Sequence, residues 1–137
     1  MDRSLIKPEL DASLVEKMKR YLAAVDAGDL DAMEQFYADD FVNIRYDKAA
    51  QAANIPKGVY MNLLRSWAAQ SDGAHPLAAA QTTHFVATTQ YGEYASVLLI
   101  RPKGLDIVSY NFVWRNQADT WRIVREFTFQ DALPQPG

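Results

Sequence analysis

The sequence contains no cysteine, which excludes disulfide bonds and thiolate chemistry. It has no excess of basic residues either, since the net charge is −3 at pH 7, and no positive field indicates a nucleic-acid partner. The opening stretch MDRSLIKPEL lacks the apolar run of a signal peptide, and no apolar run is long enough to span a bilayer. We therefore expect a cytoplasmic protein that binds neither nucleic acid nor membrane.

The motifs of several common enzyme classes are also missing. Nothing in the pattern brings His75 and His84 together, and their spacing is not that of metal ligands. The sequence has no phosphate-binding glycine loop, no glycine fingerprint and no serine–histidine–aspartate arrangement. We therefore expect a protein that works without a metal or an organic cofactor.

The composition that remains is typical of a globular domain. The chain has 137 residues, of which 49% are hydrophobic and 23% are charged, enough for one domain with a core. We expect a single domain over residues 1–137, with frayed ends at 1–12 and 131–137.

The first half of the chain has helical periodicity. Ser13 and Glu16 fit a capping box at the start of a first helix, and Gly28 fits the left-handed position after its end. Asp29 suits the cap of a short second helix, and Pro56 suits the first turn of a third. The apolar positions of the three helices are Leu14, Met18, Leu22 and Val25; Leu30, Met33, Phe36 and Tyr37; and Val59, Leu63, Leu64 and Trp67.

The second half is rich in β-branched and aromatic residues. THFVATTQ, EYASVLLIR, LDIVSYNFVWR and TWRIVREFTFQ are predicted strands, and the short turns YG, PKG and NQAD between them predict antiparallel neighbours. An earlier strand is predicted at ADDFVNIRYD, and the alanine-rich DKAAQAAN after it is expected to form one or two exposed helical turns. Helices grouped first and strands grouped last indicate the α+β class, with a curved sheet around the helices and a cavity at its open end.

The direction of the strand ADDFVNIRYD has two interpretations. Simple alternation places Val42, Ile44 and Tyr46 on the buried face and Arg45 outside. A bulge, or burial of the strand on both faces, would instead allow Arg45 to face the interior.

Two segments resemble a known superfamily. RYLAAVDAGDLDAMEQFYADDFV resembles the opening of nuclear transport factor 2-like proteins, among them the ketosteroid isomerases and the SnoaL-like polyketide cyclases, and WRIVREF resembles their last strand. The order of elements matches over essentially the whole chain. The resemblance implies a cone-shaped fold in which three N-terminal helices pack on a strongly curved, mostly antiparallel sheet around an internal cavity. It also implies a homodimer through the outer face of the sheet.

The resemblance can be carried over to single residues. The tyrosine that ketosteroid isomerases place on the first helix matches Tyr21, and their second hydrogen-bond donor matches Tyr110. Their carboxylate base matches Arg45, which stays protonated and cannot act as a base. The epoxide hydrolases of the superfamily pair an arginine with aspartates; Arg101 matches the arginine and Glu126 the carboxylate of the last strand, but no aspartate follows Arg101.

Strand alternation adds two further candidates. Tyr110 shares a face with Val108, Phe112 and Trp114, which is expected to face the core or the cavity. Arg125 shares a face with four large apolar residues, Trp121, Ile123, Phe127 and Phe129. A buried cation must be paired or must face a wet cavity, so Arg125 is expected either to pair with a helix carboxylate or to anchor an anionic ligand.

The sequence leaves two functions open. The first is a protein that binds a small anionic or aromatic ligand without catalysis. The second is a cofactor-independent SnoaL-like enzyme (an isomerase, cyclase or hydratase/dehydratase) that uses Tyr21 and Tyr110 as hydrogen-bond donors and has only Asp47 and Glu126 as nearby carboxylates. The residues predicted to line the ligand site are Tyr21, Arg45, Tyr110, Trp114 and Arg125.

Overall fold

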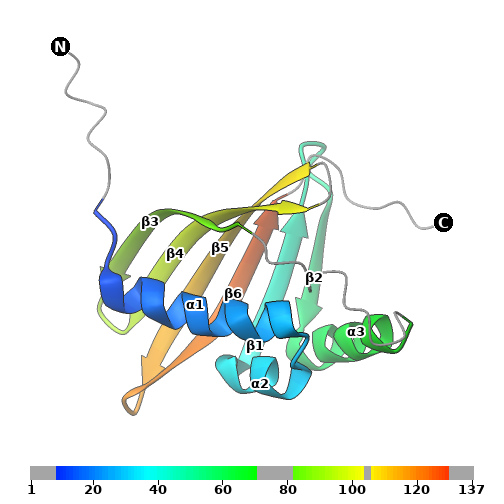
Figure 1. The fold of residues 1–137 in the computed structure, drawn as a ribbon, viewed down its shortest axis with the longest axis horizontal. Coiled ribbons are helices and arrows are strands. Elements are labelled where there is room, and N and C mark those ends of the chain that lie inside the picture. Colours follow the sequence, from blue (N-terminus) through cyan, green and yellow to red (C-terminus); the bar gives the residue numbers. More distant parts are fainter. Residues whose placement is uncertain (1–8, 71–81, 104–105, 130–137) are drawn as a thin grey trace.

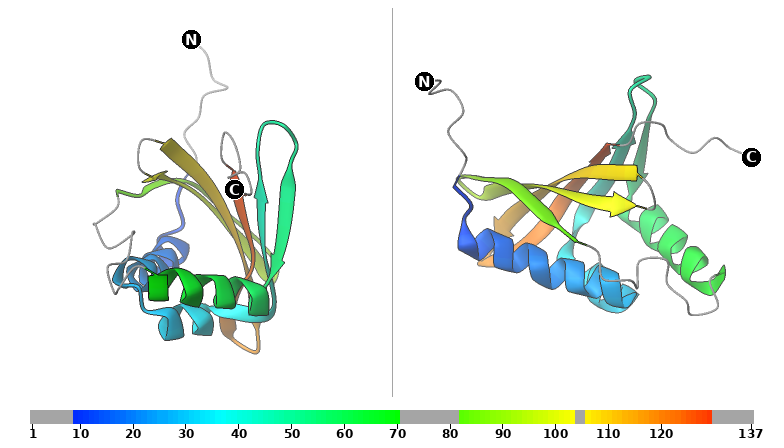
Figure 2. Two further views of the ribbon diagram at one scale, coloured as in Figure 1. Left: turned by 90° about the vertical axis from the view of Figure 1, so that its right-hand side faces the viewer. Right: turned by 45° about the horizontal axis from the view of Figure 1, so that its top comes forward.

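The computed structural model describes residues 9–70, 82–103 and 106–129, which form three helices on one face of a curved six-stranded sheet (Figures 1 and 2). The predicted turn around His75 and most of the predicted frayed ends lie outside these ranges. The elements are α1 (Ala12–Ala27), α2 (Leu30–Phe36), β1 (Tyr37–Tyr46), β2 (Ala52–Pro56), α3 (Lys57–Gln70), β3 (His84–Tyr91), β4 (Tyr94–Lys103), β5 (Asp106–Gln117) and β6 (Thr120–Phe129).

The sheet has the strand order β2-β1-β6-β5-β4-β3. Every neighbouring pair is antiparallel except β1 and β6, which are parallel because the chain crosses from one edge of the sheet to the other between them. The predicted α+β class, its three helices and its mostly antiparallel sheet are confirmed. Figure 2 shows that the helices cover the concave face and leave the opposite face uncovered.

The core lies between α1 and the concave face of the sheet. Met18 on α1 and Val97, Leu99 and Ile123 on the strands are fully buried, as alternation on β4 and helical spacing on α1 predict. Because each strand buries every second side chain here, the same face also receives whatever polar residues fall on the inward positions. No helix within the described ranges is long and apolar enough to cross a membrane.

The caps of α1 and α2 follow local sequence with one correction. Gly28 ends α1 in the left-handed conformation at φ 67°, and Asp29 caps α2 by accepting from the amide of Ala32, as predicted. The start of α1 was predicted at Ser13, but the capping residue is Asp11, whose carboxylate accepts from the amides of Ser13 and Leu14. Either residue can cap, and capping by Asp11 starts the helix two residues earlier, at Ala12.

The predicted helical turns after β1 are wrong. Residues 52–56 form β2, which pairs antiparallel with β1 from Val42↔Pro56 to Tyr46↔Ala52. The reversal depends on Asp47, whose side chain accepts from the amides of Ala49 and Gln51 and closes a tight turn. Pairing with the open edge of β1 therefore overrides the helical preference of alanine.

The predicted apolar stripe of α3 is correct only in part: Leu63 and Leu64 are half-buried and Leu64 packs against the core. The helix buries Tyr60 and Met61, whereas Val59 and Trp67 are 53% and 43% exposed. The reason is tertiary, because the ring of Tyr60 packs against Tyr37 and Phe41 on β1 and this contact sets the rotation of the helix. Trp67 is consequently left at the edge of the concave face.

Candidate functional site

A β-bulge in the last strand decides which of its side chains face the helices. In the pairing with β5, Val113 lies opposite Arg125 and Trp114 lies opposite Ile123, so Val124 is an extra residue on β6. Strict alternation is reversed beyond this point. Ile123 faces the core before the bulge, and Glu126 and Thr128 face it afterwards.

The predicted inward orientation of Arg125 is therefore wrong. Its side chain lies on the convex face, where Nη1 donates to the backbone oxygens of Asp40 (2.9 Å) and Val124 (2.7 Å). These two bonds hold the guanidinium on the convex face, and the site on the concave face does not include it.

On β1 the polar side chains face inward. Phe41 and Asn43 are buried, 1% and 0% exposed, and Arg45 continues the same face, while Val42, Ile44 and Tyr46 lie on the convex face. The orientation implied by the resemblance is thus the one that the strand adopts. The pairing with β6 shifts between Tyr37 and Val42, which is the irregularity that sets this phase.

These orientations bring five polar side chains together across three adjacent strands, here called the polar cluster. Asn43 lies opposite Glu126, while Thr128 lies opposite Arg45 on one side and opposite Tyr110 on the other. Opposed residues in a sheet have Cβ atoms about 5 Å apart, so these side chains are neighbours. The polar cluster consists of Asn43, Arg45, Tyr110, Glu126 and Thr128.

Glu126 is the centre of the polar cluster. The residue is 4% exposed, and burial raises the pKa of its carboxyl from 4.5 to about 7, against the opposing effects of Arg45, Thr128 and Asn43. Thr128 Oγ1 donates to Glu126 Oε2 at 3.4 Å. A carboxyl group that titrates near neutral pH can give or take a proton under ordinary conditions.

Arg45 supplies the positive charge of the polar cluster. Its Nε donates to Asn43 Oδ1 at 2.9 Å, and its guanidinium lies 5.6 Å from the ring centroid of Trp67 on α3. Among the residues that the structure describes, it forms no ion pair. Its terminal nitrogens therefore have no acidic protein partner in this part of the chain.

Tyrosines surround the carboxyl group of Glu126. The hydroxyls of Tyr21 and Tyr37 are hydrogen-bonded to each other. Burial raises the pKa of both well above 10, and electrostatic interactions with neighbouring groups, among them Glu126 and Tyr60, raise it further. Burial and the nearby Glu126 raise the pKa of Tyr110 to about 12, and burial also raises that of Tyr60. All four hydroxyls stay protonated at neutral pH and can act as hydrogen-bond donors.

Several buried polar atoms on this face have no partner within the described part of the chain. They include Asn43 Nδ2, Glu126 Oε1 and Arg101 Nε. Arg101 lies on β4 and is otherwise held by Asp26 on α1, at 2.8 Å between Nη2 and Oδ1. Because buried polar groups are nearly always hydrogen-bonded, these atoms mark unused binding capacity.

The structure brings together only some of the predicted ligand residues. Arg45 and Tyr110 belong to the polar cluster, and Tyr21 reaches its border through Tyr37. Trp114 does not: it is 1% exposed, its Nε1 donates to Met18 Sδ at 3.2 Å, and it packs in the apolar core. Sequence reasoning did not select Asn43 or Thr128, whose inward position depends on irregularities that no local pattern shows.

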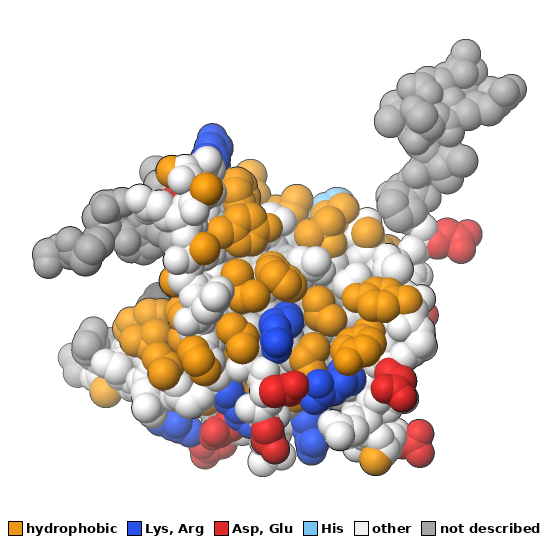
Figure 3. Space-filling model, turned by 180° about the vertical axis from the view of Figure 1, so that it is seen from behind, with side chains coloured by type: hydrophobic (Ala, Val, Ile, Leu, Met, Phe, Trp, Pro, Cys, Tyr) orange, Lys and Arg blue, Asp and Glu red, His pale blue; other side chains and the backbone are white. Residues whose placement is uncertain are grey.

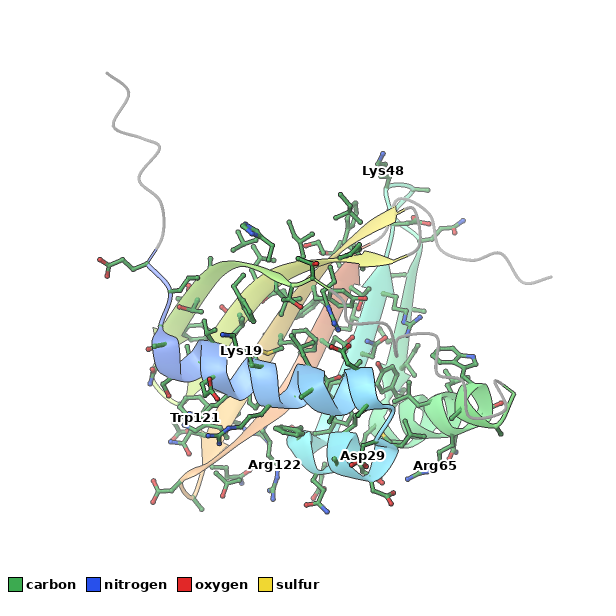
Figure 4. All side chains as sticks on the ribbon, viewed as in Figure 1. Lys19, Asp29, Lys48, Arg65, Trp121 and Arg122 are labelled. Carbon is green, nitrogen blue, oxygen red and sulfur yellow. The ribbon has the colours of Figure 1, made fainter. Side chains whose placement is uncertain are left out.

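A surface hollow outside the concave face is lined by charged residues. It measures about 680 Å³ and lies between α2, the start of α3 and one end of β1 and β6. Figure 4 labels Arg122, which is one of its lining residues. Three of its lining charges already have partners, since Glu34 pairs with Arg65 at 2.7 Å and Lys57 pairs with Asp39 at 3.8 Å. We therefore assign the candidate site to the polar cluster and not to this hollow.

Comparison with solved structures shows the same fold. An NTF2-like protein of unknown function from Silicibacter pomeroyi has 14% identity and a TM-score of 0.67 over 85% of this chain and 92% of its own. An NTF2-like protein from Cytophaga hutchinsonii has 12% identity and a TM-score of 0.65 over 95% and 99%. One with a cystatin-like fold from Novosphingobium aromaticivorans has 16% identity and a TM-score of 0.56 over 84% and 77%.

Sequence comparison adds nothing further, since no protein-family model and no curated protein matches the chain. The structural likeness confirms the nuclear transport factor 2-like fold that the resemblance predicted.

The raised pKa of Glu126 predicts how stability depends on pH. Between pH 4.5 and about 7 the folded protein keeps a proton that the unfolded chain loses, so the free energy of unfolding falls as pH rises through this range. The difference from 4.5 to about 7 corresponds to about 3 kcal/mol. Glu126→Gln cannot titrate, so its free energy of unfolding should not show this decline. The free energy of unfolding of the variant minus that of the wild type should therefore be about 3 kcal/mol higher above pH 7 than at pH 4.

Urea unfolding of both proteins from pH 4 to 8 measures this effect. The matched control is Glu93→Gln, which changes an exposed carboxylate in the β3–β4 turn and should leave the pH profile of the wild type intact. Parallel profiles for wild type and Glu126→Gln would show that Glu126 does not titrate differently in the folded state.

Proposed function

We propose that this domain binds a small molecule on the concave face of its sheet, with the polar cluster as the recognition site and a cavity over it. The observation that supports this most is the buried Asn43 Nδ2 and Glu126 Oε1, which have no hydrogen bond of ordinary geometry among the described residues. They lie beside the Arg45 guanidinium, which forms no ion pair among those residues. Burying such groups unbonded costs free energy, and a polar ligand would recover it.

The surroundings of the polar cluster favour an aromatic or anionic ligand. Tyr110 is partly buried and stacks on Phe112 with ring centroids 6.0 Å apart, which provides an aromatic wall. Trp67 is 43% exposed on the opposite side, over Arg45. Aromatic walls with a few convergent polar groups are typical of small-molecule sites.

A binding screen tests this proposal with two matched arginine variants. Small aromatic and aliphatic acids, and their neutral analogues, are tested by thermal unfolding and calorimetry. A ligand at 100 times its Kd should stabilise the protein by about 2.7 kcal/mol. Arg45→Met should weaken binding of acids at least tenfold, whereas Arg125→Met, on the opposite face, should leave it unchanged. Equal loss in both variants, or no ligand in the whole screen, would overturn the proposal.

A second candidate is a cofactor-independent enzyme that moves a proton, and one observation favours it. The pKa of about 7 at Glu126 is suited to a general base at neutral pH, the group that the sequence comparison with isomerases did not find. Glu126 would remove a proton next to a substrate carbonyl and return it to another carbon of the same molecule. The Tyr110 hydroxyl and the Arg45 guanidinium would stabilise the enolate, and Tyr21 would contribute through its bond to Tyr37.

Exchange of carbon-bound protons tests this activity. Small ketones and enones are incubated with the protein in D2O, and loss of the α-proton signal is followed by NMR. The rate should rise as pH increases through about 7, where Glu126 becomes a carboxylate, and Glu126→Gln should lower it about 100-fold or more. Glu93→Gln serves as the control. A wild-type rate equal to that of buffer, for compounds shown to bind, leaves ligand binding alone as the function.

We also propose that the protein forms a homodimer through the convex face of the sheet, as the resemblance implies. Figure 3 shows hydrophobic side chains over much of this face, which no helix covers. The patch contains Val42, Ile44, Tyr46, Leu98, Ile100, Val113, Phe127 and Phe129. A mostly apolar surface across four neighbouring strands, with Arg125 between Val42 and Val113, supports self-association better than a solvated monomer surface.

Sedimentation equilibrium tests the dimer. The wild type should have twice the chain mass of 15.4 kDa at micromolar concentration. Val113→Asp, on a central strand of the patch, should give a folded monomer, whereas Val59→Asp, on the exposed face of α3, should remain a dimer. A monomeric wild type at these concentrations contradicts the proposal.

A further inference from the structure

We propose that the polar cluster takes up a monocarboxylate together with one proton, so that Glu126 is in its acid form whenever the ligand is bound. This inference rests on the proposed binding function and deepens it, because it names the ligand class and its dependence on pH. It follows from the position of Arg45, which can neutralise either the carboxylate of Glu126 or the carboxylate of a ligand.

The first step concerns distance. Arg45 lies opposite Thr128, one inward position along β6 from Glu126, and Arg45 Nε is held by Asn43, which lies opposite Glu126 itself. A carboxylate bound to the remaining N–H groups of Arg45 would therefore lie within the same group of neighbouring side chains as Glu126. Two carboxylates this close in a buried site do not both stay ionised, as paired acids in other proteins show.

The second step concerns the balance of charge. Arg101, which is buried on β4, already has a counter-ion, since Asp26 binds it at 2.8 Å. The four tyrosines remain neutral, because burial raises the pKa of each. Arg45 is then the counter-charge for either Glu126 or the ligand, but not for both. The ionisable groups that interact with Glu126 are Tyr21 of α1, Tyr37 and Arg45 of β1, Tyr60 of α3 and Tyr110 of β5. Arg101 of β4, which Asp26 of α1 binds, interacts electrostatically with Tyr110.

The third step assigns the proton to an atom. Glu126 Oε2 accepts from the hydroxyl of Thr128, whereas Oε1 has no partner within the described part of the chain. A proton on Oε1 would convert this atom into a donor aimed at the ligand carboxylate. The bound state then contains the ligand carboxylate, the Arg45 guanidinium and the neutral acid of Glu126. Arg45 and Glu126 both donate hydrogen bonds to the ligand.

Isothermal titration calorimetry tests the proton uptake directly. At pH 8, the tightest-binding monocarboxylate of the screen is titrated in two buffers that differ in ionisation enthalpy, and its neutral carboxamide is titrated as the matched probe. The carboxylate should bind with uptake of nearly one proton per molecule, and the carboxamide with almost none. Affinity for the carboxylate should fall about tenfold for each pH unit above 7 and should level off below it.

The variant Glu126→Gln separates this mechanism from a general effect of pH. Glutamine imitates the neutral acid, so the variant should bind the carboxylate at pH 8 at least as tightly as at pH 6, with no proton uptake. Glu93→Gln should behave like the wild type. Proton uptake that persists in Glu126→Gln would place the proton elsewhere and overturn the inference.

The remaining outcomes distinguish the two proposals. Carboxylates that bind without proton uptake, or a site that accepts only neutral compounds, would overturn this inference and leave the binding function standing. No binding by any compound up to millimolar concentration at pH 6 would overturn both.

Discussion

The extra residue Val124 in β6 is the feature on which the interior of this protein depends. By reversing the alternation of the strand, it turns Glu126 and Thr128 toward the helices and Arg125 toward the convex face. Without the bulge, the concave face would receive a cation and two phenylalanines in their place. The bulge thus converts what would be an ordinary apolar interior into one that contains a titratable acid.

A buried acid is costly, and its surroundings show how the fold accommodates it. Burial shifts Glu126 toward its neutral form, which removes most of the cost at acidic pH, while Thr128 and Asn43 provide polar neighbours. Above neutral pH, where Glu126 is ionised, Arg45 lowers the free-energy cost of the buried carboxylate without forming a close ion pair with it. Perturbed acids of this kind cluster at functional sites, and for this reason both proposals, ligand binding and proton transfer, are built on this cluster.

The nuclear transport factor 2-like fold itself places few limits on chemistry, since one fold can serve many functions. In the isomerases that the sequence resembles, the position on β1 holds a base, and here it holds Arg45. The buried carboxyl group of this chain is on β6, where Glu126 lies opposite Asn43. The concave face therefore keeps a carboxyl group, a cation and tyrosine hydroxyls but distributes them differently over the strands.

Much of the architecture was determined by the sequence alone. The periodicity of Leu14, Met18, Leu22 and Val25, the left-handed Gly28 and the aromatic strands specify α1 and the antiparallel sheet, because caps, turns and alternation act over a few neighbouring residues. The strand β2, the buried face of α3 and the inward or outward position of Arg45 and Arg125 were decided only by the tertiary structure. Each of these depends on which distant segment completes a strand edge or where a bulge changes the phase, and that free energy comes from contacts between residues far apart in the chain.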